Sequence, residues 1–215
     1  MNQAAINKRG LLFQLLRKAV KTLAIPSLAD FKTTIMLVTK EDYTIEPIKV
    51  YYLEMHSNPR FILPDKETVS LKQLKKPVDV ETYRRYYKSV GWQYNWLDRL
   101  TFSDEELAAA INAGHVEIFV LQINNEDAGY AEFAIINDYV EIVYFGLFAE
   151  FIGRGTGKFF LYRCVNKAWS YNPGWIQLNT CALDHPNALG VYQSAGFEIV
   201  RTAMEDRKVL LKNKL

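Results

Sequence analysis

The sequence contains few cysteines and few histidines. Its 215 residues include two cysteines, Cys164 and Cys181, and three histidines. The cysteines form no close pair and the histidines lie far apart, which excludes the Cys-x-x-Cys spacing of a zinc site. Two thiols in a chain of this size also exclude a disulfide framework and indicate a reducing compartment. We therefore expect a cytoplasmic protein without a metal site.

Long hydrophobic runs and a large excess of one charge are also absent. No apolar run reaches the roughly 20 residues that a membrane-spanning helix needs. Lys and Arg number 26 and Asp and Glu number 24, a net charge of +2, which argues against a protein that coats nucleic acid. Apolar residues make up 49% and charged residues 23%, which excludes a mainly disordered chain and predicts a globular one.

The charges are distributed unevenly along the chain. Residues 1–40 hold seven basic residues and one acid, for +6, whereas residues 41–215 carry −4. Between Leu11 and Ala24, apolar residues recur at three- and four-residue spacing, which predicts an amphipathic helix that ends at Pro26. We interpret residues 1–40 as a basic helical extension with a linker and residues 41–215 as the main domain.

Several roles stay open for this extension. A basic amphipathic helix can bind an anionic membrane surface or a partner protein. The same helix can instead cover an exposed sheet edge or a dimer seam. The segment also shares the basic, acid-poor character of an organelle transit peptide. The sequence leaves both a monomer and a homodimer open.

The main domain shows an α+β order of elements. A strand is predicted over Ile45–Met55, followed by a loop with three prolines over residues 56–80. Helical patterns cover Val80–Val90, Ser103–Ala113, Thr156–Tyr171 and Pro186–Ala195, and strand patterns cover His115–Asn124, Gly129–Ile136, Tyr139–Leu147 and Trp175–Ala182. The chain is predicted to end in a hairpin made of Phe197–Met204 and Lys208–Leu211.

A glycine-rich turn joins a predicted strand to a predicted helix. The segment Gly153–Lys158 contains three glycines together with Arg154 and Lys158. Glycines let the backbone approach a ligand closely, and a helix start offers free N–H groups and a positive dipole end that suit a phosphate. The spacing matches neither a Walker A loop nor a Rossmann fingerprint. By itself, the pattern is equally consistent with a tight structural turn.

Two blocks of sequence resemble the GNAT N-acetyltransferase family. The run Glu141–Gly157 is similar to the acetyl-CoA-binding core of that family, with Gly155 and Gly157 at its two small positions. The run Leu178–Phe197 is similar to the family ending N-x-x-A-x-x-x-Y-x-x-x-G-F. Ile152 replaces the usual Gln or Arg, and His185 replaces the usual Asn.

The resemblance covers roughly residues 45–213 and implies a GNAT-like mixed β-sheet that is splayed open and flanked by helices. The pantetheine arm of acetyl-CoA would lie in the split. The implied function is transfer of an acetyl group to a primary amine by direct attack on the thioester. The alternative is a non-catalytic acyl-CoA-binding regulatory module, which the two departures favour. The implied cofactor contacts are Gly146, Leu147, Phe148, Gly153, Arg154, Gly155, Thr156, Gly157, Lys158 and His185.

Acetyl transfer requires an amine without its proton, and a lysine-like amine has a pKa of about 10.4. The resemblance implies that Tyr192 is the acid that protonates the departing thiolate, although this residue can instead be a packing aromatic. Glu141 lies 14 residues before Gly155, the spacing of the family's base. We expect it to share a face with Val143, Phe145 and Leu147, where desolvation would raise its pKa. A structural strand glutamate, with a water chain as base, is the alternative.

The acceptor pocket is expected beside the loop between the first two helices of the main domain. Trp92, Tyr94 and Trp96 could form an aromatic wall that suits an ammonium or a flat substrate. Arg99 could hold a charged group of the acceptor. The alternative is that the tryptophans anchor the core and that Arg99 belongs to a surface ion pair. The sequence does not identify the acceptor itself.

Overall fold

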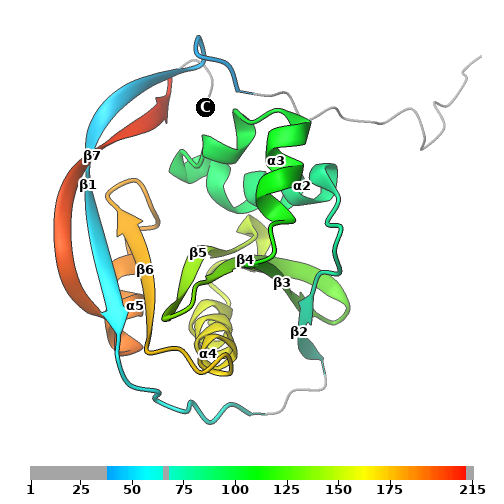
Figure 1. Ribbon diagram of the computed structural model, residues 1–215, viewed down its shortest axis with the longest axis vertical. Helices are drawn as coiled ribbons and strands as arrows, with labels where there is room; N and C mark the ends of the chain where they lie inside the picture. The colour runs from blue at the N-terminus through cyan, green and yellow to red at the C-terminus, as the bar shows by residue number, and fades with distance from the viewer. Residues whose placement is uncertain (1–37, 65–67, 212–215) are drawn as a thin grey trace, which may run out of the picture. The chain divides into compact units, whose positions relative to one another are not determined.

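The computed structural model describes residues 38–64 and 68–211, so all but the end of the predicted basic extension lies outside the described residues. The described chain forms one mixed seven-stranded sheet with strand order β2-β3-β4-β5-β6-β1-β7, and four α-helices flank it (Figure 1). The strands are β1 Tyr43–Met55, β2 Val69–Gln73, β3 Val116–Ile123, β4 Glu126–Ile135, β5 Tyr139–Leu147, β6 Trp175–Cys181 and β7 Glu198–Leu210. The helices are α2 Val80–Gly91, α3 Asp104–Ile111, α4 Thr156–Trp169 and α5 Ala188–Ser194.

The helices predicted for residues 41–215 and the strands β1 and β3 to β6 are confirmed, whereas the helix predicted between Leu11 and Ala24 lies outside the described residues. Local signals explain their starts. Asp79 accepts a hydrogen bond from the backbone N–H of Thr82 and caps α2, and Ser103 and Glu106 form the predicted capping box of α3. Of the described helices, none has the length and hydropathy needed to cross a membrane.

Two predictions for the sheet are wrong. The segment 56–80 is not entirely loop, because it contains β2, whose five residues pair with β3. The predicted C-terminal hairpin is a single strand, β7, which pairs with β1 from Tyr43 to Glu54. The long strand β1 lies between β6 and β7 and pairs with both. It therefore supplies a partner along the whole of β7 and replaces the second arm of a hairpin.

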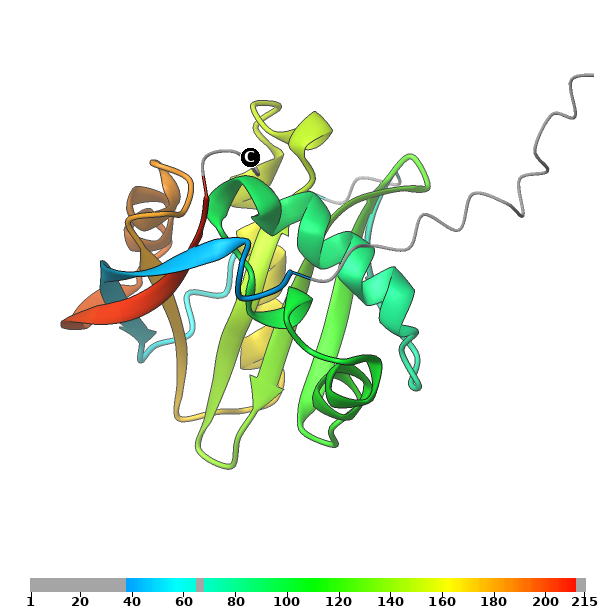
Figure 2. The same cartoon turned by 90° about the horizontal axis from the view of Figure 1, so that it is seen from above.

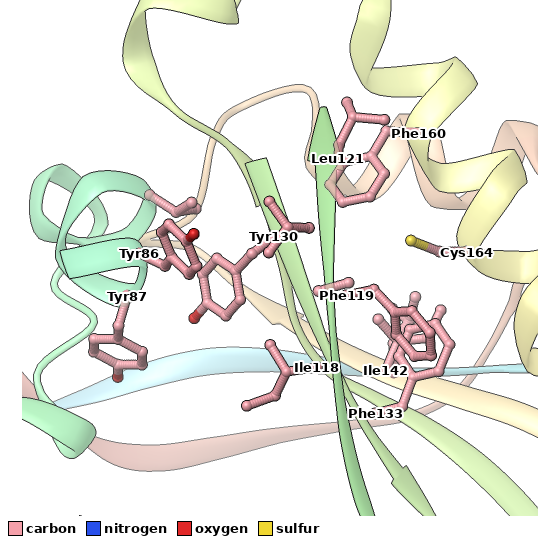
Figure 3. Packing of buried hydrophobic residues seen from close by; sticks show 14 of the residues in the cluster. Tyr86, Tyr87, Ile118, Phe119, Leu121, Tyr130, Phe133, Ile142, Phe160 and Cys164 are labelled. Atoms are coloured by element: carbon pink, nitrogen blue, oxygen red, sulfur yellow. The ribbon is translucent and has the colours of Figure 1, made fainter. Parts of the chain in front are cut away.

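The helices pack on both faces of the sheet (Figure 2). Figure 3 shows Tyr86 and Tyr87 of α2 next to Tyr130 on one side of the strands, with Phe160 of α4 on the other side. Phe160 is fully buried and packs at a tilt against Phe145 of β5, with a centroid distance of 4.7 Å. Full burial of such a side chain stabilises the fold by about 1.5 to 3 kcal/mol.

The sheet opens between β5, its central strand, and β6. The strands β5 and β6 form its parallel pair, and their register covers Tyr139–Glu141 against Trp175–Gln177. Beyond this point β5 continues to Leu147 beside β4, while β6 continues to Cys181 beside β1. The two strands therefore diverge, and the split between them positions the site described next.

Candidate functional site

A pocket of about 460 Å³ lies where β5 and β6 diverge. Its walls include Tyr144–Leu147 of β5 and three residues of β6, which are Leu178, Asn179 and Cys181. Among the described residues, the β5–β6 ladder ends at Glu141 and Gln177. The facing backbone edges beyond this point can therefore form hydrogen bonds with a ligand.

One end of the pocket is formed by the glycine-rich turn. Gly153 and Gly155 have φ values of 81° and 73°, which L-residues with a Cβ rarely adopt. Gly155 is the N-cap of α4 and offers no side chain to the amides of the first helical turn. These amides and the ammonium group of Lys158, which also lines the pocket, make this end suited to a phosphate.

The structure separates the predicted cofactor contacts into two groups. Those that line the pocket are Gly146, Leu147, Gly153, Gly155, Gly157, Lys158 and His185. Phe148, Arg154 and Thr156 do not line it. The Phe148 ring is buried and stacks on Tyr86 at 5.6 Å, and the Arg154 guanidinium lies 5.3 Å from the centre of the Phe151 ring. Phe148 therefore serves the core instead of the pocket wall.

Tyr192 projects from α5 into the pocket wall. Its ring makes edge contacts with Phe145 and Phe197, each at 6.3 Å. Burial raises the pKa of the phenol above its ordinary value, and the negative charge of Asp184 raises it further. The hydroxyl has no hydrogen-bond partner among the described residues. Tyr192 is thus a protonated group whose hydroxyl is available to a ligand.

Glu141 lies at the closed end of the split and does not line the pocket. Its register partner is Gln177, whose Nε2 donates to Glu141 Oε2 at 3.4 Å. Burial raises the pKa of Glu141, and the hydrogen bond from Gln177 opposes this shift. The carboxyl group is therefore desolvated, as the sequence suggests. It lies outside the pocket wall, whereas the sequence places it beside the reacting groups.

Two of the three predicted neighbours of Glu141 on its strand face, Phe145 and Leu147, are wrong. A β-bulge in β5 leaves Val143 without a register partner, since Ile142 pairs with Phe133 and Tyr144 pairs with Glu132. The bulge shifts the side-chain alternation by one residue. After it, Phe145 and Leu147 lie on the face that α4 covers, and Glu141 lies on the opposite face.

The aromatic loop contributes Tyr94 and Trp96 to the pocket, whereas Trp92 does not line it. Trp96 packs against Tyr87 and Tyr144 at centroid distances of 5.7 and 5.2 Å. Gly91 permits this packing, because a Cβ there would lie 2.3 Å from the Cβ of Trp96. The predicted aromatic wall is therefore built from Trp96 together with two tyrosines of α2 and β5.

Asp184 is a central residue that the sequence interpretation missed. Its Oδ1 accepts a hydrogen bond from Trp96 Nε1 at 2.9 Å. Its Oδ2 accepts from Thr180 Oγ1 and from the backbone N–H of Cys181, at 2.8 and 2.9 Å. Asp184 thereby holds the loop after β6 against the aromatic wall. Its place directly after a strand, where Asp often bonds to nearby backbone, is a signal that could have indicated this role.

Arg99 lies behind the aromatic wall and does not line the pocket. Its Nη2 donates to Glu132 Oε1 at 2.6 Å, and the side chain of Glu132 is 1% exposed. The hydroxyl of Tyr83 donates to the other oxygen of Glu132. The guanidinium also lies 5.6 Å from the centre of the Tyr144 ring. Arg99 therefore supports the wall from behind instead of offering a free charge to an acceptor.

The charged groups at the β7 side of the pocket are paired. Lys208 Nζ donates to Asp98 Oδ1 at 2.8 Å, and Arg207 donates to Glu205 at 3.0 Å. Cys181 lines the pocket, and burial raises the pKa of its thiol, so it stays protonated at neutral pH. The described residues contain no cluster of His, Cys, Asp and Glu that could hold a metal ion.

The model of the acetyltransferase (GNAT) family matches residues 80–197, more than half of the chain. A GCN5-related N-acetyltransferase from Sphaerobacter thermophilus has a similar fold, with a TM-score of 0.57 and 11% identity, over 79% of this chain and 53% of that chain. A functionally unknown conserved protein from Staphylococcus epidermidis ATCC 12228 has a TM-score of 0.50 and 14% identity, over 78% and 64%. The ribosomal-protein-S18-alanine N-acetyltransferase from Escherichia coli has a TM-score of 0.50 and 13% identity, over 66% and 95%.

These similarities show a shared fold. This chain spans between half and two thirds of the length of the first two structures. A search of curated proteins found no match.

Proposed function

Because this chain belongs to the GNAT acetyltransferase family, we propose that it transfers an acetyl group from acetyl-CoA to a primary amine by direct attack. The observation that carries the proposal is the pocket between the diverging strands. It extends from the glycine-capped start of α4 to the Tyr192 hydroxyl. This arrangement offers a phosphate site, two unpaired strand edges and a proton donor in one continuous space.

The residues present fit acetyl-CoA. The amides at the start of α4 and Lys158 suit its phosphates, and the free edges of β5 and β6 suit the amide groups of its pantetheine arm. Nδ1 of His185 lies 3.1 Å from the backbone N of Asn187. Since that backbone N–H donates, Nδ1 accepts, and Nε2 of the neutral ring carries the proton. His185 can therefore donate one hydrogen bond to a ligand, as the family's usual Asn can.

When acetyl-CoA is bound, it supplies the thioester carbonyl that the amine attacks. In the proposed mechanism, backbone amides near Gly146 and Leu147 stabilise the carbonyl oxygen as it gains charge. A C–N bond forms as the C–S bond breaks, and Tyr192 gives its proton to the departing sulfur. Glu141 accepts the proton of the amine. Because Glu141 lies outside the pocket wall, that proton must be relayed to it instead of passing directly.

The test is release of free thiol from acetyl-CoA by the full chain, measured across a panel of primary amines. We expect amine-dependent release, with the acetylated amine identified by mass spectrometry. Tyr192→Phe is the matched control, since it removes only the hydroxyl. Saturable acetyl-CoA binding without turnover on any amine would contradict the proposal and favour the non-catalytic module.

A further inference from the structure

The outer edge of β7 is unpaired in the described chain. β7 is the last strand of the sheet order and pairs with β1 on one side only, with Val200 left without a register partner at a bulge. Three of its apolar side chains are well exposed, namely Ile199, Val200 and Met204, at 40%, 51% and 63%. A long edge strand with exposed apolar residues is a template for pairing with another strand.

The charges on this edge are arranged in a specific way. Arg201 pairs in register with Tyr52 of β1, and its guanidinium lies 3.5 Å from the centre of the Tyr52 ring. No carboxylate of the described residues lies within ion-pair distance of Arg201. Glu205 lies four residues further along the same face, where Tyr52 and Arg207 both donate to it. One face of β7 thus carries a positive charge without an acidic partner and a negative charge, symmetrically placed about Ala203.

We propose that β7 pairs with β7 of a second copy of this chain, antiparallel, about a two-fold axis at Ala203. In this register Arg201 lies directly opposite the partner's Glu205, and Glu205 lies opposite the partner's Arg201. Thr202 lies opposite the partner's Met204 on the other face. The small side chain of Ala203 pairs with its own copy on the axis. Directly opposed side chains on one face interact, and opposite charges at such positions are favourable.

The order of charges in β7 selects this register. In an antiparallel pair, directly opposed side chains lie on the same face of the sheet, and residues on one face are an even number of positions apart. The two-fold axis of a symmetric pair therefore passes through a residue and not between two residues. An axis at a charged residue would oppose that charge to its own copy, which excludes Arg201, Glu205, Asp206 and Arg207 as centres. An axis at Met204 would oppose Arg201 to the partner's Arg207. An axis at Thr202 would oppose Arg201 to an alanine. Among the axes at Thr202, Ala203 and Met204, which set no charge opposite its own copy, only the axis at Ala203 places opposite charges together.

The same register also brings apolar residues together. Met204 is diagonal to the partner's Met204, within reach of a long side chain. The pairing would therefore cover the exposed side chain of Met204 and place an acidic group opposite Arg201, while Glu205, which already accepts from Arg207, gains a second cationic neighbour. A contact limited to one strand edge is small compared with a standard interface, so we expect a dimer that dissociates on dilution.

Sedimentation velocity of the full chain at a series of concentrations tests the proposal. We expect concentration-dependent dimerisation of the native protein up to about 100 µM, a range that covers weak interfaces. Arg201→Glu and Glu205→Arg should each weaken the dimer about tenfold, because each sets like charges opposite each other twice. An equimolar mixture of the two variants should recover dimerisation, since each edge contact then joins opposite charges again.

The control variant is Asp206→Arg, an adjacent charge reversal at a position that does not directly oppose a charged residue of the partner in this register. It should leave the dimer unchanged, and thermal melting of each variant checks that the fold is retained. A native chain that stays monomeric over the whole range would overturn the proposal, as expected if residues 1–37 cover this edge. A dimer that neither reversal weakens, or a mixture that stays monomeric, would also overturn it.

Discussion

At the scale of single residues, burial sets the protonation of the groups around the pocket. It raises the pKa of Tyr192, of Cys181 and of Glu141. A phenol and a thiol with raised pKa keep their protons at neutral pH, so Tyr192 can act as an acid and Cys181 is a poor nucleophile. For Glu141, the raised pKa makes the carboxylate a better proton acceptor than an exposed glutamate.

The first prediction concerns the hydroxyl of Tyr192. Tyr192→Phe should lower kcat on the order of 100-fold, because it removes the group proposed to protonate the thiolate. The ring contacts with Phe145 and Phe197 stay, so the affinity for acetyl-CoA should change little. Steady-state thiol release and calorimetric binding measure the two effects separately. An unchanged kcat on a good acceptor would show that the hydroxyl does not participate.

The second prediction concerns the charge of Glu141. Its pKa is raised in the folded state, so its contribution to stability is fully present below the unfolded-state pKa and is lost as the pH rises through the folded pKa. Glu141→Gln removes this penalty and keeps an oxygen that can accept from Gln177. The melting temperature of the variant relative to the native protein should therefore be higher at pH 7 than at pH 4.

Activity supplies a second measurement on the same variant. If Glu141 is the base, the acidic limb of the pH profile of kcat/KM should disappear in Glu141→Gln. If the variant keeps the acidic limb, Glu141 is not the base and its role is structural. A difference in melting temperature that does not depend on pH would contradict the effect of burial on its pKa.

At the scale of elements, backbone conformation decides where glycine is required. Gly155 caps α4 at a φ of 73°, and a Cβ there would meet no atom within 4 Å. The requirement at this position is thus conformational and not steric. Gly190 lies within α5, also has open space around it, and its φ is not positive. The two glycines form a natural pair for comparison.

The third prediction uses this pair. Gly155→Ala should lower the free energy of unfolding by about 1 to 2 kcal/mol, the cost of a left-handed conformation for an L-residue. It should also weaken acetyl-CoA binding, because the start of α4 must shift. Gly190→Ala should raise the free energy of unfolding by about 0.5 to 1 kcal/mol. Urea unfolding measures both, and the same sign for the two variants would refute the argument.

The fourth prediction concerns the contact between α2 and β5. A Cβ at Gly146 would lie 2.3 Å from Cγ1 of Val90, so Gly146→Ala should cost about 1 to 3 kcal/mol through overpacking. Val90→Ala removes the clashing methyl group. In the double variant, the effect of Gly146→Ala should therefore be smaller than in the native background. Additive effects in urea unfolding would show that the two residues do not press on each other.

At the scale of the whole molecule, a buried ionic network connects the helical segment 80–111 to the sheet. Glu132 of β4 is almost fully buried and binds Arg99 and Tyr83. Removal of one partner from such a pair leaves a buried charge without compensation. The guanidinium of Arg99 also packs against the ring of Tyr144, which lines the pocket. The network therefore connects the stability of the fold to the shape of the pocket.

The fifth prediction follows from this network. Glu132→Gln should lower the free energy of unfolding by about 3 kcal/mol, because the guanidinium of Arg99 stays buried without its carboxylate. Glu126→Gln on the same strand is the control, since Glu126 is exposed and its substitution should have little effect. Urea unfolding of both variants measures the difference. Equal stabilities would mean that Arg99 finds another partner or reaches solvent.

The sequence by itself determined most helices and strands, because the spacing of apolar residues and the capping residues lie within each segment. The capping box of α3 and the glycine-rich turn before α4 are complete within a few neighbouring residues. The short strand β2 was missed since five residues carry too little pattern. The C-terminal hairpin was predicted wrongly because nothing in β7 reveals that β1 pairs along its whole length.

The site shows the same division. The glycine-rich turn and Tyr192 are recognised from motifs in single segments, and Gly153, Gly155, Lys158 and Tyr192 line one pocket. Asp184 bonds to Trp96 across 88 residues, and Arg99 bonds to Glu132 across 33. The bulge at Val143 also places Glu141 on the opposite face from Phe145 and Leu147. Only the tertiary structure decided these points, because contacts between distant segments depend on strand order and register, which local patterns do not encode.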